Sequence, residues 1–329
     1  MKLGLAVYGT TFMMGIHPQS TRARITASQL LEQAAQLNLQ GIELPLSLLE
    51  GEDVAALARR AREGGQYLVV ASGGYDPKPL AQALEAAVQL GAPTVRTVVG
   101  GADFGGDRRK MAGRWPAFME EVLSGLGEAA HVAAKAGVAL AVENHQDLAS
   151  EELLWLCEEI DSPNFGITLD TGNPLATAEE PVHFARKIAP HLKHVHLKDY
   201  WTYLSEEGYR LVRCPLGQGV VDFPALFQVF ETYCPEVNMS MELGALDARH
   251  TRVLCDDYWS EYPVRSAAQL AGLLRFVQTN AKPMGDWRTP FEQGATEDEI
   301  IAYEQRQLLT SVAYMQGAVQ ARGGGRREH

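Results

Sequence analysis

VALAVEN at residues 138–144, FGITLD at 165–170 and LKHVHL at 192–197 are three apolar segments that follow one another along the chain, with helical patterns near 150–160 and 179–189 between them. Each segment has the length of a buried strand, whereas the patterns between them have the period of an amphipathic helix. Strands that alternate with helices in this way are typical of parallel βαβ units.

The same alternation extends in both directions from this region. Five further apolar segments bring the total to eight: 3–8, 41–44, 67–71, 93–99 and 237–243. Further helical patterns lie near 27–37, 52–63, 78–90, 114–136, 222–233 and 265–280. Eight such units favour a closed (β/α)₈ TIM barrel of the α/β class over an open doubly wound sheet. No G-x-G-x-x-G opens the first helix, which further disfavours a Rossmann fold.

The chain is long enough for one barrel and a short extension. We expect the barrel to occupy residues 1–280 as a single domain and residues 281–329 to form a C-terminal helical extension with a disordered tail. In the extension, a helix near 297–318 would place Ile301, Leu308, Val312 and Met315 on one apolar stripe. The last residues, RGGGRREH, are rich in glycine and charge, so we expect them to be disordered.

Composition excludes several classes of partner. The formal net charge of −12 disfavours nucleic acid and anionic membranes. No apolar run approaches the roughly 18 residues of a membrane span, and MKLGLAVYGT at the N-terminus resembles a first strand more than a signal peptide. The four cysteines form no C-x-x-C pair, which indicates reduced thiols in a cytoplasmic protein.

Ionisable residues stand at the ends of the last four predicted strands. The segments end in Glu143, Asp170, His196 and Glu242, in chain order. The carboxyl ends of the strands of such a barrel meet on one rim, where its chemistry takes place. Side-chain alternation agrees with this direction, because His194, His196 and Lys198 share one face of their strand.

Three carboxylates and one imidazole at close range require a cation, because like charges would otherwise force protonation. One divalent metal ion, held by Glu143, Asp170, His196 and Glu242, meets this requirement. An oxygen-rich ligand set with a single nitrogen suits Mn²⁺ first, with Mg²⁺, Co²⁺ and Zn²⁺ as the alternatives.

Five motifs in the second half of the chain resemble the xylose-isomerase-like barrels. They are the strand that carries Glu242 together with ENHQDL (143–148), LDTGN (169–173), HVHLKD (194–199) and RCPLGQGVVDF (213–223). The resemblance covers roughly residues 1–280 and is specific mainly in the second half. That superfamily holds sugar isomerases, ketose 3-epimerases, inosose dehydratases and the endonuclease IV group.

The resemblance implies roles for individual residues. The four strand-end residues match the family's metal ligands, and Glu143 and Glu242 also match the acid/base pair of the epimerases. Arg213 matches an arginine that contacts the substrate. Asn173 stands where many relatives have a histidine, three residues after the aspartate ligand, so the epimerase mechanism does not transfer directly.

Other candidates each have a functional and a structural interpretation. His145 is expected to be a hydrogen-bond donor or general acid, the alternative being a cap on the next helix. Lys198 would either bind a substrate carbonyl or carboxylate or pair with Asp199. Trp201, in the aromatic-rich segment 199–213, would stack on a sugar face in a lid or pack the C-terminal helix. Glu43, which ends the second strand, would hold a substrate hydroxyl, orient a neighbour or line the barrel.

These features predict a metal-dependent enzyme that removes the proton beside a sugar carbonyl to give an enediolate. A sugar isomerase or epimerase is the first interpretation. A lyase on a keto-sugar acid of the 3-oxo-isoapionate decarboxylase type, a keto-sugar dehydratase and a C-glycoside-cleaving enzyme are the alternatives. The expected partner is a small carbohydrate, and the expected assembly is a homo-oligomer. An abasic-site endonuclease is disfavoured by the charge, and a non-catalytic sugar-binding barrel by the complete ligand set.

Overall fold

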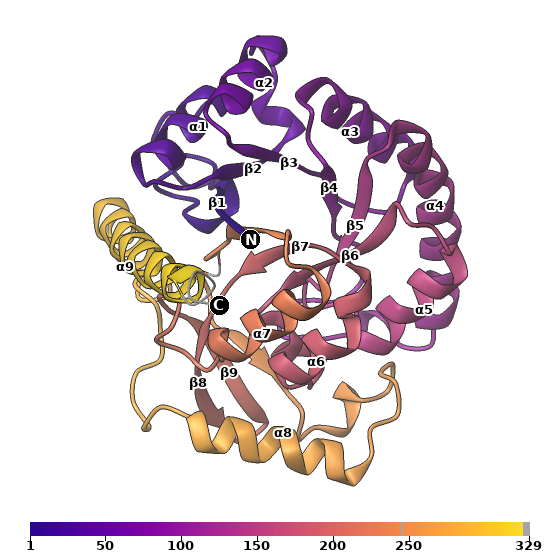
Figure 1. Ribbon diagram of the computed structural model, residues 1–329. Coiled ribbons are helices and arrows are strands. Elements are labelled where there is room, and N and C mark those ends of the chain that lie inside the picture. The colour runs from indigo at the N-terminus through magenta and orange to yellow at the C-terminus, as the bar shows by residue number, and fades with distance from the viewer. Residues whose placement is uncertain (245, 325–329) are drawn as a thin grey trace.

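Eight parallel strands close into a barrel in the computed structural model, which describes residues 1–244 and 246–324 (Figure 1). Neighbours around the barrel follow the chain from β1 to β7, and β10 closes the ring between β7 and β1. The predicted TIM barrel is therefore confirmed. Its strands are β1 Lys2–Ala6, β2 Gly41–Pro45, β3 Tyr67–Ala71, β4 Thr94–Thr97, β5 Ala139–Glu143, β6 Phe165–Asp170, β7 Leu192–Leu197 and β10 Asn238–Met241.

The helices form where the sequence predicts them, and side chains cap several of their first turns. Thr26 forms a capping box with Gln29 at the start of α1, and Asp53 and Asp222 accept backbone N–H groups at the starts of α2 and α7. The helices are α1 Ala27–Gln36, α2 Val54–Glu63, α3 Pro77–Leu90, α4 Trp115–Ala136, α5 Ser150–Ile160, α6 Pro181–Ile188, α7 Phe223–Tyr233, α8 Ala267–Asn280 and α9 Glu297–Gly324.

The last helix joins the barrel wall. Its side chains bond the carbonyl of Leu37 after α1 and that of Pro224 in α7, so α9 lies between these two helices, while α8 lies beside β8 and β9 (Figure 1). Leu308, Val312 and Met315 are buried as expected, but Ile300 rather than Ile301 completes the stripe. The helix is longer than the predicted 297–318 and ends at Gly324, and the remainder of the tail expected to be disordered, residues 325–329, lies outside the described part of the chain.

A bulky tyrosine fills the barrel interior below the strand ends. Tyr67 donates a hydrogen bond to the carbonyl of Met239 and lies 3.1 Å from the hydroxyl of Ser240. A Cβ added at Gly4 or Gly41 would meet the Tyr67 side chain at 2.2–2.3 Å, so only glycine fits at these two strand positions. The interior is thus a packed polar layer that supports the rim above it.

An antiparallel sheet covers part of the rim, in a region that the sequence predicted as loops. It consists of β8 Tyr200–Ser205, β9 Gly208–Arg213 and β11 Arg249–Thr251, in the order β11-β9-β8. Tyr200 pairs with Arg213, and Leu211 pairs with Arg249, so these side chains share one face. All four are buried. Trp201, the next residue after Tyr200, lies on the opposite face.

A second hydrophobic core fixes this sheet and the aromatic segment after it. Tyr209 packs with Tyr258 and Tyr262, and the same cluster includes Leu273 and Val277 of α8. The aromatic side chains after β7 and β10 therefore contribute to packing under α8. Among the described residues, no helix is both long and apolar enough to cross a membrane.

Candidate active site

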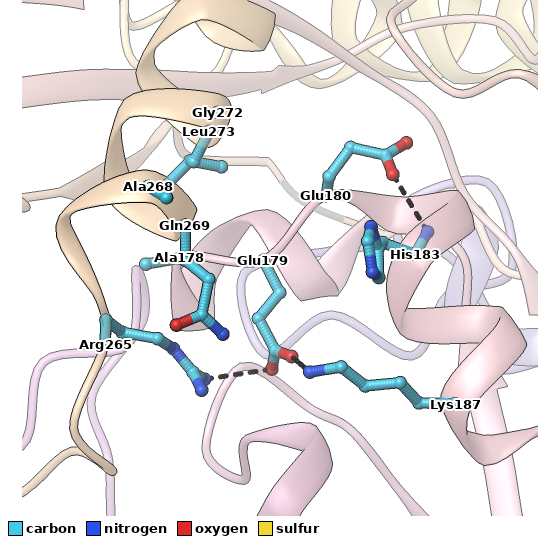
Figure 2. A pocket seen from close by; sticks show the side chains of 10 residues that line it. All are labelled: Ala178, Glu179, Glu180, His183, Lys187, Arg265, Ala268, Gln269, Gly272 and Leu273. Carbon is cyan, nitrogen blue, oxygen red and sulfur yellow. Dashed lines mark hydrogen bonds and ion pairs between the residues drawn. The ribbon is translucent and has the colours of Figure 1, made fainter.

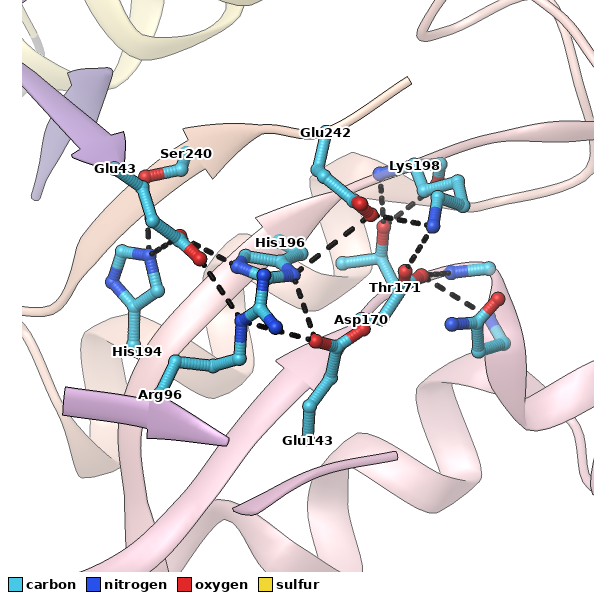
Figure 3. A network of polar contacts seen from close by, with 12 residues as sticks. Glu43, Arg96, Glu143, Asp170, Thr171, His194, His196, Lys198, Ser240 and Glu242 are labelled. Atoms are coloured by element: carbon cyan, nitrogen blue, oxygen red, sulfur yellow. Dashed lines mark hydrogen bonds and ion pairs between the residues drawn. The ribbon is translucent and has the colours of Figure 1, made fainter. Parts of the chain in front are cut away.

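Four donor side chains converge at the carboxyl end of the barrel. Glu143, Asp170, His196 and Glu242 each offer one ligand atom, and these atoms lie within 4.8 Å of one another (Figure 3). All four residues are buried. The register explains the convergence, because Asp170 pairs with His196 across β6 and β7, while Glu143 ends β5 beside them. Barrel closure therefore assembles the predicted ligand set.

One atom of each ligand forms no well-aligned hydrogen bond with any other described residue, although Lys198 Nζ lies 2.6 Å from the atoms on Asp170 and Glu242. These buried atoms are Glu143 Oε1, Asp170 Oδ2, His196 Nδ1 and Glu242 Oε2. Buried polar atoms are almost always partnered in folded proteins. Four such atoms in one cluster, three of them carboxylate oxygens, form the donor set of a divalent ion site. The residues therefore fit a metal ion.

The histidine is oriented by a second carboxylate. Glu43 Oε2 lies 2.6 Å from His196 Nε2, which leaves Nδ1 facing Glu143 at 3.4 Å (Figure 3). A ligand histidine commonly donates its other ring N–H to a carboxylate in this way. Arg96 and His194 hold Glu43 in turn, at 3.0 and 3.2 Å. The orienting role considered for Glu43 thus has a geometric basis.

Lys198 bridges two of the ligands. Its Nζ lies 2.6 Å from Asp170 Oδ2 and 2.6 Å from Glu242 Oε2, and the side chain is 2% exposed. The alternative pairing with Asp199 is wrong, because that carboxylate instead accepts the backbone N–H groups of Gly217, Gly219 and Val221. Lys198 therefore belongs to the charge balance of the cluster.

The cluster contains more negative than positive charge. Four carboxylates, the three ligands and Glu43, face two permanent cations, Arg96 and Lys198. Burial, together with the neighbouring carboxylates and despite Lys198, raises the pKa of Asp170 to about 6. Burial would lower the pKa of His196, but Glu43 and Glu143 raise it to about 10. Protons on these two groups can thus balance the charge that a divalent ion would supply.

The two acid/base candidates differ in their electrostatic surroundings. Burial opposes ionisation of Glu143, but His196 and Arg96 outweigh it and hold the pKa of this carboxyl well below its usual range. Glu242 has Lys198 as its closest cation, at 2.6 Å. Both carboxylates line the same cavity.

A cavity of about 510 Å³ opens beside the cluster, on the β1 to β5 side of the rim. Among its lining residues are Tyr8, Arg96 and His145, together with both acid/base candidates. The Arg96 guanidinium lies over the Tyr8 ring at 5.4 Å. This space is large enough for a small sugar and supplies hydrogen-bonding groups around it.

The structure brings some of the predicted substrate residues to this region and places others elsewhere. His145 lines the cavity. Asn173 is buried near the cluster, where its Oδ1 accepts hydrogen bonds from Gln146 and Tyr200. Trp201 lies outside, with its ring N–H bonded to the Gln218 carbonyl. The sheet pairing turns Trp201 away from the rim, so the structure does not support a substrate contact for it.

Arg213 lies buried behind the rim. Its Nη2 donates to the Gly9 carbonyl at 3.0 Å, and Glu304 of α9 lies 3.8 Å from Nη1. Glu304 also accepts the backbone N–H groups of Phe12 and Met13. Arg213 therefore connects β9, the segment after β1 and the C-terminal helix, and a substrate contact for it stays a prediction.

Arg96 and Tyr8 are the site residues that the sequence analysis missed. Arg96 is the one charged residue in the apolar segment PTVRTVV, and a charge inside a buried strand is a signal that could have identified it. Tyr8 follows β1 without any distinguishing motif. Only the closed barrel places it over Arg96.

A second cavity, of about 390 Å³, lies on the outer wall between α6 and α8 (Figure 2). Its charged residues pair with one another, since Glu179 contacts both Lys187 at 3.1 Å and Arg265 at 3.3 Å. None of the four candidate ligands lines it. The chemistry is therefore assigned to the rim.

The chain belongs to the family of xylose isomerase-like TIM barrels, which it matches over residues 31–245. This match includes all four candidate ligands and the motifs around them, so it confirms the family predicted from the sequence.

Curated relatives in this family are distant. YihM of Escherichia coli, an uncharacterised protein, is 25% identical over 215 residues, which cover 62% of each chain. The 3-oxo-isoapionate decarboxylase of Pectobacterium atrosepticum is 30% identical over 108 residues, or 32% of this chain and 39% of the enzyme. The match thus spans less than two thirds of either relative.

Solved structures share the fold. A D-tagatose 3-epimerase-like protein has a TM-score of 0.57 at 18% identity, covering 85% of this chain and 99% of its own. An IOLI protein with a bound zinc atom has a TM-score of 0.58 at 14% identity, covering 86% and 100%. At such identities the likeness establishes the barrel architecture and leaves the reaction to be argued from the site.

Proposed function

We propose that this protein is a divalent-metal-dependent sugar isomerase or epimerase that acts on a small keto sugar. One observation carries the proposal: four buried ligand atoms, one each from Glu143, Asp170, His196 and Glu242, meet beside a cavity of sugar size. Membership of a xylose isomerase-like family supports it. Mn²⁺ is the proposed ion, with Mg²⁺, Co²⁺ and Zn²⁺ as alternatives, and a zinc atom in the IOLI protein is consistent with such a site.

The bound ion would supply positive charge beside the substrate carbonyl, which acidifies the neighbouring C–H and stabilises the enediolate. Glu242 is the proposed base, because it lines the cavity, with Lys198 at 2.6 Å and His196 at the longer distance of 3.9 Å. Glu143, held by His196 and Arg96, would act with His145 as the second acid/base group. Proton return to the same carbon would give epimerisation, and return to its neighbour would give isomerisation.

Arg96 and Tyr8 would bind substrate oxygens at the cavity wall. Lys198 would stabilise a substrate oxygen close to Glu242, and Asn173 would take the place of the histidine found in many relatives. The four metal ligands, the three acid/base groups and these binding residues form one proposed site. The Arg213→Ala variant tests whether Arg213 contacts the far end of the substrate. If Arg213 makes this contact, the substitution should raise KM.

A lyase acting on a keto-sugar acid is the second candidate. Three features favour it: Asn173 in place of the histidine of many relatives, Lys198 beside two of the proposed metal ligands, and similarity to a 3-oxo-isoapionate decarboxylase. Loss of CO₂ from a β-keto acid also leads to an enediolate, so the same residues would serve. We further propose a cytoplasmic homo-oligomer whose partner is a small carbohydrate and not nucleic acid or a membrane.

The test combines metal analysis with isotope exchange. The purified protein is analysed for metal, loaded with Mn²⁺ and mixed with ketoses and keto acids in D₂O. Deuterium entering the carbon beside the carbonyl supports the isomerase or epimerase, whereas CO₂ release supports the lyase. Absence of metal binding together with absence of both reactions would reject the proposed function.

A further inference from the structure

Each of three buried cations at the catalytic end has its own carboxylate. Arg96 lies 3.0 Å from Glu43, Lys198 lies 2.6 Å from Glu242, and Arg213 lies 3.8 Å from Glu304. Such pairing is the ordinary condition of a buried charge, because an unpaired one is costly to remove from water.

Arg249 is the exception. It is 8% exposed, yet its guanidinium forms no hydrogen bond and no ion pair within 4.0 Å with any residue in 1–244 or 246–324. Its Nε is fully buried and unpartnered. Burial lowers the pKa of this side chain, which is the opposite of the effect of the carboxylates on Arg96. The group carries donors that the protein itself does not use.

The carboxylates near Arg249 are engaged elsewhere or exposed, and one of them, Glu242, pairs with Lys198 at 2.6 Å. Glu292 accepts the backbone N–H groups of Ala248 and Thr289. Asp247 is exposed to solvent. Neither Glu292 nor Asp247 forms an ion pair with the Arg249 guanidinium. The missing counter-ion is therefore not supplied by a neighbouring turn.

Position links Arg249 to the substrate cavity. It shares the inner face of the three-stranded sheet with Tyr200 and Arg213. Its guanidinium lies 3.4 Å from the centroid of the Phe104 ring, which is 6.2 Å from the ring of His145. His145 lines the cavity with both acid/base carboxylates. A planar cation stacked on an aromatic ring is held in one orientation, with its edge left for a ligand.

We propose that Arg249 binds an anionic group of the substrate, a carboxylate or a phosphate, so that the protein selects acidic sugars over neutral ones. The inference rests on the proposed function, because it assigns the substrate class of that same site. The anionic group of the ligand would act as the counter-ion of Arg249, which the described residues do not provide. It suits this role because a guanidinium can pair with two anionic oxygens at once. Phe104 acts as a positioning residue by fixing the guanidinium plane.

The experiment uses three matched probes on the Mn²⁺-loaded protein. D-fructose, D-fructuronate and D-fructose 6-phosphate differ only in a terminal hydroxymethyl, carboxylate or phosphate group. Binding is measured by calorimetry for the wild type, Arg249→Met and Arg249→Lys. Arg210→Met is the control, because Arg210 lies on the same sheet, on its outer face over the Trp287 ring.

The wild type should bind at least one anionic probe about tenfold or more tightly than D-fructose, since charge-assisted bidentate contacts are strong. Arg249→Met should abolish that preference, Arg249→Lys should retain part of it, and Arg210→Met should keep it whole. Preference for D-fructuronate identifies a carboxylate, and preference for D-fructose 6-phosphate identifies a phosphate. Equal binding of all three probes by the wild type, or a preference that survives in Arg249→Met, would overturn the inference.

Stability separates this role from a structural one. Removing an uncompensated buried charge should leave the ligand-free Arg249→Met protein at least as stable to heat as the wild type. A clear loss of stability would show that Arg249 has a structural partner and would count against ligand binding. If Glu242→Gln abolishes turnover of a ketose while Arg249→Met keeps the wild-type preference for an anionic probe, the proposed function stands and only this inference is rejected.

Discussion

At the scale of single residues, the site is built from side chains whose partners come from other strands. His196 is oriented by Glu43 of β2, and Glu143 is held by Arg96 of β4. Removing one member of such a buried network leaves the others with unpaired charges. The effect of a substitution here therefore depends on whether it removes a ligand oxygen, a proton acceptor or a charge.

Glu143→Gln and Glu242→Gln separate metal binding from proton transfer. Glutamine keeps an oxygen donor but cannot accept a proton, so each variant should lose about 10²- to 10⁴-fold in kcat while metal remains bound. Steady-state kinetics with metal analysis of the same samples checks this. Near wild-type turnover in both metal-loaded variants would remove the acid/base assignment.

Lys198→Met should bind Mn²⁺ more tightly than the wild type. The ammonium lies 2.6 Å from two proposed ligand oxygens, so it competes with the ion for the same negative charge. Removing it should tighten Mn²⁺ binding by about tenfold or more. Lys187→Met is the control, because Lys187 also bridges two glutamates, but in the outer cavity. Unchanged or weaker Mn²⁺ affinity in Lys198→Met, measured by chelator competition, would contradict the prediction.

At the scale of elements, α9 and the three-stranded sheet decide the shape of the rim. The sheet brings Arg213 and Arg249 to the inner side, and α9 adds Glu304 from nearly a hundred residues further along. A buried carboxylate on a C-terminal helix thus reaches the segment that follows the first strand. The helix acts as a clamp on that segment.

Glu304→Gln should loosen this clamp. The amide is a weaker acceptor for Phe12 and Met13 and leaves Arg213 without its counter-ion, so the free energy of unfolding should fall by about 1–3 kcal/mol. KM should also rise, because Tyr8 on the same segment lines the cavity. Denaturant titration measures the free energy of unfolding, and steady-state kinetics measures KM. Asp298→Asn, an exposed change on the same helix, should alter neither; equal effects of the two substitutions would show that Glu304 has no special role.

At the scale of the whole molecule, proposed metal binding and folding are linked through protons. The pKa of Asp170 is raised to about 6, so the metal-free protein is stabilised by the protonated carboxyl at low pH and loses that contribution as pH rises through about 6. The same reasoning applies to His196 up to a pKa of about 10. The ion binds the deprotonated groups, so acid competes with it.

The stabilisation by Mn²⁺ should therefore grow with pH. At a hundredfold excess over Kd it should reach about 2.7 kcal/mol near neutral pH and shrink as pH falls below about 6. Thermal unfolding with Mn²⁺ and with EDTA, from pH 5 to 8, gives the difference directly. The Asp170→Asn variant should lose most of the stabilisation by Mn²⁺. A Tm increment that is the same at pH 5 and pH 8 would argue against proton competition at Asp170.

The sequence by itself determined the eight βα units and the residues at the strand ends. Local periodicity encodes each strand and helix, and in a parallel barrel the carboxyl ends of consecutive strands must share one rim. Glu143, Asp170, His196 and Glu242 could therefore be grouped before any contact was known. The same local reasoning identified Lys198 and His145 as neighbours of that group.

Only the tertiary structure decided which charges meet. Arg96 pairs with Glu43 because β4 and β2 lie on either side of β3 in the closed barrel, and Glu304 meets Arg213 because α9 returns between α1 and α7. Sheet alternation in β8 and β11 turned Trp201 outward and Arg249 inward, in a region without a strong period-2 pattern. Counter-charges distant in sequence leave no local signal, since their energy depends on burial and on distance, which exist only after the chain has folded.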